Sequence, residues 1–399
     1  MKILVVCQHY YPEPFRITEI CEDLVSRGHQ VTAVVGLPNY PSGIVPKEYR
    51  WFRKRRETIR GVDVRRCFEI GRKNTKVGLA VNYISYMLSA CWKVLWLKQD
   101  YDVIYAYSTS PVLMSLPASF LRCFANRKLV IYILDIWPAC LSAMNVEEGS
   151  LLYAFMKHVS RWVYRKADIL LISSKRFQQY LSNVHDLSIP DDHYLPQFVD
   201  CTFSTLPVAE ANFGFHLVFA GNIGKMQGVN TLLLSANLLR NEPVTWHFLG
   251  DGSDYNACVA LSKELSLERV IFHGRRPLEE MPAYYAMADA LLVSLRNQSS
   301  VSDTLPGKVQ SYMAAGKPIL GSIAGETAYI IQQANCGLCA PPEDAESFAQ
   351  TVRNFMCLSQ LRRRQMGENA RSYYQKHFTR QYHMDKLEKI LLALSSKEG

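Results

Sequence analysis

Short apolar segments alternate with helical patterns along the first half of the chain. Runs of Val, Ile and Leu that are bounded by polar residues predict buried strands. Residues 18–27 carry apolar positions at helical spacing, and Gly28 follows as a glycine that ends a helix. Strand alternating with helix predicts a mostly parallel sheet covered on both faces. The strands expected here are 2–7, 30–35, 103–107, 129–134 and 169–173.

The same pattern restarts after a stretch rich in proline and polar residues, 187–212, which we interpret as a linker. We therefore expect an α/β protein with an N-terminal Rossmann-like domain over 1–195 and a second one over 196–380. A C-terminal helix in 381–399 is expected to pack back on the first domain. The second half is predicted to contain strands 216–220, 245–249, 270–273, 290–294 and 319–322, and helices 229–239 and 309–315.

Composition and length fit two globular domains. The 399 residues exceed one ordinary core, and 48% hydrophobic with 20% charged residues argues against disorder. The start lacks the pattern of a signal peptide, and residues 77–97, the most apolar stretch, are interrupted by Asn82, Ser85, Ser89 and Lys93. The 11 cysteines follow no disulfide framework, and the lone pair Cys336 and Cys339 is interpreted as chance spacing. A cytoplasmic protein is expected.

Positive charge is concentrated in one segment. The net charge of the whole chain is +9, and residues 47–76 contain 12 basic and 4 acidic residues, a balance of +8. Trp51 and Phe52 lie inside this basic cluster. Such a surface suits an anionic membrane or a phosphate-bearing acceptor. Nucleic acid or a merely solvated loop would fit the same pattern.

Glycine turns follow three successive strands of the second half. Gly221 to Gly228 follows the first strand, Gly250 and Gly252 follow the second, and Gly274 with Arg275 follows the third. Glycine lets the backbone approach a ligand closely, and a helix that starts after such a turn offers free N–H groups to a diphosphate. In doubly wound sheets ligands bind at the carboxyl ends of strands. The three turns therefore predict a nucleotide site.

A polar loop leads into a helix of small residues over 303–319. Gly316 and Pro318 stop that helix before the next strand. The loop and the start of the helix are expected at the same edge of the sheet as the glycine turns. Ala314 and Ala315 permit tight helix packing, so part of this segment serves the fold.

Taken together, these segments resemble the retaining glycosyltransferases of family four, which have the GT-B fold. The chain is also similar, within that family, to bacterial fucosamine-type transferases of O-antigen and capsule assembly. The resemblance spans nearly the whole chain. Its matching segments are 9–13, 15–17, 27–31, 37–41 with Gly43, 135–138, 220–224, 306–318 and 325–326.

The resemblance implies two doubly wound domains that face a central cleft. It implies transfer, with retention, of a sugar such as N-acetyl-fucosamine from a nucleotide diphosphate, most simply UDP. The implied acceptor is an oligosaccharide on an undecaprenyl diphosphate type of lipid, reached from the inner face of an anionic membrane. No cofactor or metal is expected, because lysine and backbone N–H groups can stabilise the departing diphosphate. No nucleic-acid partner is expected.

Some residues depart from the family pattern. The Arg and Lys that clamp the diphosphate are replaced by Asn222 and Gln227, and Lys225 between them is the cation expected to act instead. Of two glutamates that meet the donor sugar and ribose, the first corresponds to Asp303 and the second to Ser311, beside Gln310. Asp135 corresponds to the residue near the reacting sugar.

The resulting site prediction has three parts. The catalytic residues are Asp135, Lys225 and Asp303. The donor-binding residues are Gly221, Asn222, Gly224, Lys225, Gln227, Gly250, Gly252, Gly274, Arg275, Asp303, Thr304, Leu305, Lys308, Gln310 and Ser311. The acceptor-binding residues are Glu13, Arg16, Asn39, Tyr40 and Tyr107.

Alternative functions are distinguished by their chemistry. A sugar-nucleotide epimerase of the same fold would act without an acceptor, and a nucleic-acid-binding protein would show strongly salt-dependent affinity but has no need of glycine turns. A dehydrogenase is disfavoured because neither domain opens with GxGxxG. Asp100-Tyr101-Asp102 resembles a metal motif, but it precedes a strand and is interpreted as the entry to that strand.

Overall fold

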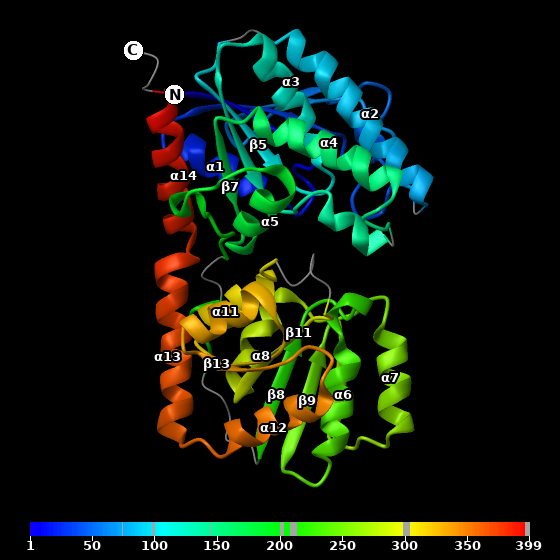
Figure 1. Ribbon diagram of the computed structural model, residues 1–399, viewed down its shortest axis with the longest axis vertical. Helices are drawn as coiled ribbons and strands as arrows, with labels where there is room; N and C mark the ends of the chain where they lie inside the picture. The colour runs from blue at the N-terminus through cyan, green and yellow to red at the C-terminus, as the bar shows by residue number, and fades with distance from the viewer. Residues whose placement is uncertain are drawn as a thin grey trace. The chain divides into compact units, whose positions relative to one another are not determined.

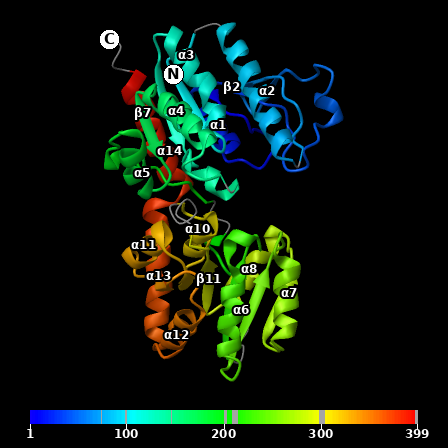
Figure 2. The ribbon, with the colours of Figure 1, turned by 45° about the vertical axis from the view of Figure 1, so that its right-hand side comes forward.

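The chain folds into two compact units, each built on its own sheet (Figures 1 and 2). The computed structural model describes residues 1–73, 75–97, 100–144, 146–199, 203–207, 214–297 and 304–395. Unit 1 comprises Met1–Leu195 and the C-terminal segment that starts at Met384, and unit 2 comprises Pro196–His383. Asp303, predicted to act in catalysis and donor binding, lies outside the described residues.

Unit 1 contains a seven-stranded sheet in which all neighbouring strands are parallel except one pair. Its strands are β1 (Lys2–Val6), β2 (Gln30–Val35), β3 (Arg56–Ile59), β4 (Val62–Arg66), β5 (Val103–Ser108), β6 (Lys128–Ile133) and β7 (Ile169–Ile172). The strand order is β3-β4-β2-β1-β5-β6-β7, and β3 pairs antiparallel with β4. The predicted doubly wound α/β fold is thereby confirmed.

Helices cover both faces of this sheet. They are α1 (Ile17–Ser26), α2 (Lys76–Leu95), α3 (Leu116–Phe124), α4 (Leu151–Arg165) and α5 (Arg176–His185), with 3-10 turns at Lys47–Tyr49, Val112–Ser115, Ala139–Met144 and Asp191–His193. Helices α2 to α5 share one core with alternate side chains of the central strands. Thr75 and Ser150 cap α2 and α4 through their hydroxyls, which satisfies N–H groups that have no partner within the helix.

The basic segment 47–76 is more ordered than a solvated loop. Strands β3 and β4 form a hairpin within it, and several of its cations are paired: Arg56 and Arg65 with Asp63, and the buried Arg66 with Glu57. Apolar and polar residues alternate in β4, but this strand pattern was not recognised in the sequence because charged residues surround it. Asp100 and Asp102 bond to Lys2 at the amino edge of the sheet, which agrees with their interpretation as a strand entry.

Unit 2 is a second parallel sheet of six strands. They are β8 (Phe215–Ala220), β9 (Val244–Leu249), β10 (Val270–Gly274), β11 (Ala290–Ser294), β12 (Ile319–Ser322) and β13 (Gly337–Ala340), in the order β10-β9-β8-β11-β12-β13. The helices are α6 (Val229–Leu238), α7 (Tyr255–Glu264), α8 (Met281–Met287), α10 (Gly307–Ala314), α11 (Gly325–Gln333), α12 (Ala345–Met356) and α13 (Gln360–His377), with 3-10 turns at Lys225–Gln227 and Leu278–Glu280. Two apolar cores lie on the two faces of this sheet.

The last helix, α14 (Arg380–Ser395), begins in unit 2 and ends in unit 1. Figure 1 shows α14 in red beside α1 in blue. Arg27 at the end of α1 bonds to Asp385 and Glu388, both at 2.7 Å, and His29 bonds to Glu388. Among the helices of the described residues, none has the length and apolar character needed to cross a bilayer.

Candidate functional site

The glycine turns of unit 2 lie side by side at the carboxyl edge of its sheet. Strands β8, β9 and β10 are parallel neighbours, so Gly221, Gly250 and Gly274 meet at one edge. The Gly221 N–H donates to Leu249 O at 2.9 Å, and the Gly250 N–H donates to Gly274 O at 2.8 Å. Gly250 has φ 129°, and a Cβ there would lie 1.8 Å from Gly221 O. Only glycine permits this close approach of backbone to backbone.

The next residues continue this tight rim. The Ile223 N–H donates to Asp251 O at 2.7 Å, and a Cβ on Gly252 would lie 2.5 Å from Ile223 O. Asn222 is exposed beside these turns, and Gly224 is buried behind it. Arg275 is exposed and lies 3.8 Å from Asp251. The glycine turns therefore expose their backbone at the carboxyl edge of the sheet.

Lys308 supplies a cation to this rim from the first turn of α10. Its Nζ donates to Gln227 Oε1 at 2.6 Å and lies 3.9 Å from the centre of the Phe219 ring. A Cβ on Gly221 would lie only 3.3 Å from that Nζ. Burial lowers the pKa of Lys308 to about 7, because the ammonium is removed from water.

Lys225, the cation favoured from sequence, has a different environment. It begins a 3-10 turn and is exposed to solvent. Gln227 in the same turn is tied down twice, since its backbone O accepts from Ser294 Oγ at 2.6 Å and its side chain accepts from Lys308. The sequence placed Lys308 among the donor-binding residues but gave the charge-supplying role to Lys225. Geometry favours Lys308 because its ammonium already lies against Gly221.

Helix α10 is anchored to the end of β8. The Tyr312 hydroxyl accepts from the Ala220 N–H at 2.9 Å and donates to Ala220 O at 3.1 Å. Gln310 is buried and its amide donates to Gln197 O, whereas the Ser311 hydroxyl bonds to Gly307 O of its own helix. The side-chain amide of Gln310 is therefore already engaged by a hydrogen bond within unit 2. Thr304 and Leu305 are half-buried just before the helix.

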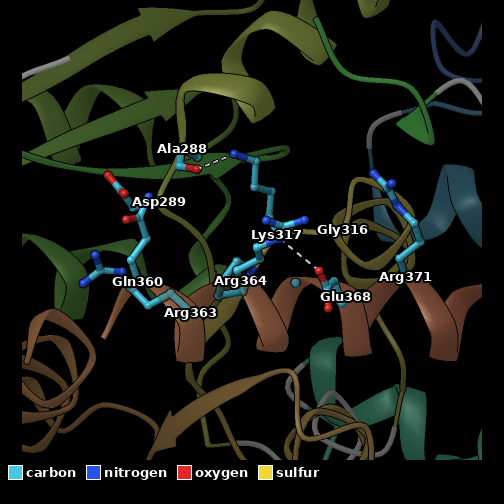
Figure 3. Close-up of a pocket in the computed structure, with 11 residues that line it drawn as sticks. Ala288, Asp289, Gly316, Lys317, Gln360, Arg363, Arg364, Glu368 and Arg371 are labelled. Carbon is cyan, nitrogen blue, oxygen red and sulfur yellow. Dashed lines mark hydrogen bonds and ion pairs between the residues drawn. The ribbon is translucent and has the colours of Figure 1, made fainter. Parts of the chain in front are cut away.

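The opposite, amino edge of the same sheet carries a hollow of about 430 Å³ (Figure 3). It is lined by residues before β11 and β12 and by the start of α13. Its cations are already engaged: Lys317 donates to Ala286 O and Ala288 O, and Arg364 pairs with Glu368 at 3.0 Å. This hollow lies away from the glycine rim and contains none of the predicted site residues.

Asp135 occupies the carboxyl edge of the sheet in unit 1, two residues after β6. Its Oδ2 accepts from the Ser110 N–H at 3.0 Å, and Ser110 follows the neighbouring strand β5. Burial raises the pKa of Asp135, and the hydrogen bonds from Ser110 oppose that shift. Trp137 donates from Nε1 to Ser110 Oγ at 3.1 Å and fixes the turn.

Other predicted residues gather near Asp135. Tyr107 on β5 is buried, and burial raises its pKa, while Arg16 lowers it and Asp135 raises it further through their charges. Tyr83 on α2 is subject to the charges of Asp135, Arg72 and Glu69 in the same way, after burial as the main cause of its raised pKa. These residues therefore share one neighbourhood within unit 1.

Glu13, Asn39 and Tyr40 form a second group at that edge. Glu13 is buried: its Oε2 lies 2.7 Å from His9 Nδ1, and its Oε1 accepts from the N–H groups of Asn39 and Tyr40 at 2.7 and 2.6 Å. Tyr40 is half-exposed and its ring contacts Phe15 and His9. Glu13 thus fixes the backbone of Asn39 and Tyr40, and the Tyr40 side chain lies at the surface of unit 1.

Sequence reasoning missed a second buried carboxylate, Glu69, which also contacts Asn39. Glu69 accepts from Gln8 Nε2 at 2.7 Å, Asn82 Nδ2 at 2.6 Å and Asn39 Nδ2 at 2.9 Å, and also from the Leu37 N–H. Burial raises the pKa of Glu69 to about 7. Asn82 interrupts an apolar stretch of the sequence, and that interruption was the signal for a buried polar partner.

Two family models match consecutive parts of the chain. Residues 15–195 match "Glycosyl transferase 4-like domain", and residues 214–357 match "Glycosyl transferases group 1". The chain is therefore a glycosyltransferase with the GT-B fold. It joins a 4-like domain in unit 1 to a group 1 domain in unit 2.

Whole-chain comparisons agree with this class. The probable glycosyltransferase WbjE of Pseudomonas aeruginosa is 24% identical over 83% of this chain and 85% of its own. The putative colanic acid biosynthesis glycosyl transferase WcaI of Escherichia coli is 21% identical over 90% of this chain and 93% of its own. The solved structure of Anabaena HepE in complex with UDP covers 99% of this chain and 100% of its own, with a TM-score of 0.70 and 16% identity.

Proposed function

We propose that this glycosyltransferase moves a sugar from a UDP-linked donor to a lipid-linked oligosaccharide during assembly of a bacterial surface polysaccharide. The name of the relative WcaI, which refers to colanic acid biosynthesis, supports the polysaccharide, and the UDP complex of HepE supports the nucleotide. N-acetyl-fucosamine, suggested by the sequence resemblance, is the first donor sugar to assay. The acceptor is of the undecaprenyl diphosphate type, met at the cytoplasmic face of the inner membrane.

The proposal rests on one observation. The side chain of Lys308, at the start of α10, lies against the exposed backbone of Gly221, which follows β8. A diphosphate placed there would meet the Lys308 ammonium, the first N–H groups of α10 and the exposed glycine turn. These groups stabilise negative charge on the departing diphosphate during transfer, so that step is proposed to need no metal. Asp303 and Ser311 are proposed to contact the sugar and ribose, and Asn222 the diphosphate.

Asp135 is proposed to act on the acceptor side. A retaining transfer passes through a transition state with positive charge on the sugar ring, and a carboxylate can stabilise that charge or orient the attacking hydroxyl. Tyr107, Arg16 and Tyr40 are proposed to position the acceptor. A sugar-nucleotide epimerase would instead convert the donor without any acceptor, and assays with and without acceptor separate the two reactions.

Calorimetric titration of UDP into the full chain tests the donor site. Wild type should bind, Lys308→Met should bind at least tenfold more weakly, and Lys225→Met should show the smaller loss. Lys263→Met, an exposed lysine on α7, is the control and should bind like wild type. Excess chelator in every titration should leave the affinities unchanged. If the wild type does not bind UDP, or if only Lys225→Met weakens binding, the assignment to Lys308 is wrong.

The same titration has an expected pH dependence. With a pKa of about 7 in the free protein, Lys308 loses its charge as pH rises above 7. A bound diphosphate favours the ammonium, so binding takes up a proton and affinity should fall between about pH 7 and pH 9. Lys308→Arg keeps its charge in this range and should flatten the profile. A wild-type affinity that does not change with pH would contradict this role.

A further inference from the structure

Helix α2 has two apolar faces, of which only one is used by the fold. Asn82, Tyr86, Ala90 and Val94 are buried against unit 1. On the other side, every exposed residue from Val77 to Trp96 is apolar, at a spacing that keeps them on one face of the helix. These exposed residues are Val77, Ala80, Val81, Ile84, Leu88, Trp92, Leu95 and Trp96.

A groove of about 760 Å³ continues this apolar face. It lies between α2 and the β3–β4 hairpin with the residues that flank it. Apolar side chains from both segments line it, and cations stand among them. The lining includes Phe52, Phe68, Leu88, Trp92, Arg55 and Lys93.

Two aromatic side chains stand out from the neighbouring turn. Trp51 is 88% exposed and Phe52 is 76% exposed. Their φ angles are 53° and 61°, in the left-handed region that bulky residues rarely adopt. The backbone is therefore strained at two positions where large apolar groups are held in water, although the Phe52 ring keeps a cation–π contact with Arg55 at 5.2 Å.

The charged side chains that line the groove are all cations, and three of them, Arg56, Arg65 and Arg66, pair with Asp63 or Glu57. Residues 70–99 contain no Asp or Glu and five Lys or Arg. Across the groove, no carboxylate of the described residues lies within salt-bridge distance of Arg50, Arg53, Lys54 or Arg55. A second copy of the chain would bring like charges together, whereas anionic lipid complements them.

We propose that the exposed face of α2, the adjoining groove and the Trp51–Phe52 turn together form the surface that docks on an anionic lipid bilayer. Helix α2 lies along the bilayer, its apolar face reaches the acyl boundary, and the cations meet lipid headgroups. Trp92, Trp96 and Trp51 suit the boundary between headgroups and acyl chains. This surface lies in unit 1 and does not depend on the donor site of unit 2.

Co-sedimentation with vesicles tests the proposal. The full chain should bind vesicles of phosphatidylglycerol and phosphatidylethanolamine, weakly bind phosphatidylcholine vesicles, and lose affinity with added salt. Leu88→Glu with Trp92→Glu should lower the affinity at least tenfold. Trp51→Gly with Phe52→Gly should do the same while relieving the backbone strain. Arg53→Gln with Lys54→Gln should reduce mainly the preference for anionic lipid.

A matched control replaces two leucines of similar exposure in unit 2. Leu278→Glu with Leu361→Glu changes side chains that are 59% and 77% exposed and should bind vesicles like wild type. Circular dichroism melting and UDP titration establish that each variant is folded. If the α2 variant binds vesicles like wild type, the proposal is wrong. It is equally overturned if wild type is a dimer without lipid that the α2 variant dissociates, with no vesicle binding by either protein.

Discussion

Asp135 and Lys308 show how single residues acquire chemistry from burial. Burial raises the pKa of the Asp135 carboxyl and lowers that of the Lys308 ammonium, because in both cases it favours the uncharged form. Each also makes a hydrogen bond that fixes its position: Asp135 accepts from the Ser110 N–H, and Lys308 donates to Gln227 Oε1. Groups of this kind at the carboxyl edges of parallel sheets are typical of functional sites.

The mutation Asp135→Asn should separate chemistry from folding. The amide keeps an oxygen for the Ser110 N–H but loses the negative charge, so turnover should fall about a hundredfold or more while UDP affinity stays unchanged. Turnover, UDP titration and melting temperature check this.

The matched control is Asp168→Asn at the amino edge of the same sheet. Asp168 pairs with Arg122 and Lys128, so its loss should lower the melting temperature and leave turnover per folded molecule unchanged. A stable Asp135→Asn enzyme with full turnover would exclude an essential role for Asp135.

The segment after β2 depends on a buried network and not on regular secondary structure. Asn39 and Leu37 are held by Glu69, and Asn39 and Tyr40 by Glu13. A buried carboxylate that accepts several hydrogen bonds is costly to disturb, because its donors lose their partner. The network therefore fixes the conformation of residues 37–40, including Tyr40.

We expect Glu69→Gln to destabilise unit 1 by about 2 kcal/mol, since an amide N–H₂ then faces donors. Folded Glu69 has a pKa of about 7, above its ordinary value of 4.5. The folded state therefore keeps a proton that the unfolded state loses, and this group's contribution to stability falls as pH rises from about 4.5 to 7. Denaturant unfolding from pH 5 to 8 should show that component in wild type and lack it in Glu69→Gln.

The exposed Glu48→Gln serves as the control for this measurement and should unfold like wild type at every pH. Acceptor KM is the functional readout, and it should rise in Glu69→Gln while UDP affinity is unchanged. Identical unfolding profiles for wild type and Glu69→Gln would contradict the assigned role of the network.

At the scale of the whole molecule, α14 returns the chain to the unit in which it started. Met384, Leu387 and Leu391 are buried, and Arg27 and His29 bond to the polar face of the helix. Ending the chain after His383 should cost unit 1 about 4 kcal/mol, since each buried leucine contributes about 2 kcal/mol. Unit 2 should keep its UDP affinity.

Hydrogen exchange at α1 and calorimetric melting measure this loss. A chain that ends after Ser395 retains the described helix and serves as the control. Equal protection of α1 in the two truncated chains would mean that α14 does not support unit 1.

Much of the architecture could be predicted from the sequence. The expected strands of both sheets match observed ones to within about two residues at their ends, because apolar runs between glycine and polar turns are local signals. Strands β3, β4 and β13 were missed, since the first two lie in a cluster of charge and the third, Gly337–Ala340, is short and has no β-branched residue.

The sequence by itself determined the class of fold, the two sheets and the glycine turns after β8, β9 and β10, because periodicity and turn chemistry act between near neighbours. Only the tertiary structure decided which charged groups meet those turns. Lys308 is about 80 residues from Gln227 in sequence, and Glu69 is 61 from Gln8, yet each pair forms a hydrogen bond. It also left one face of α2 uncovered. Long-range packing sets burial, and burial sets pKa and exposure, so these properties cannot be read from local pattern.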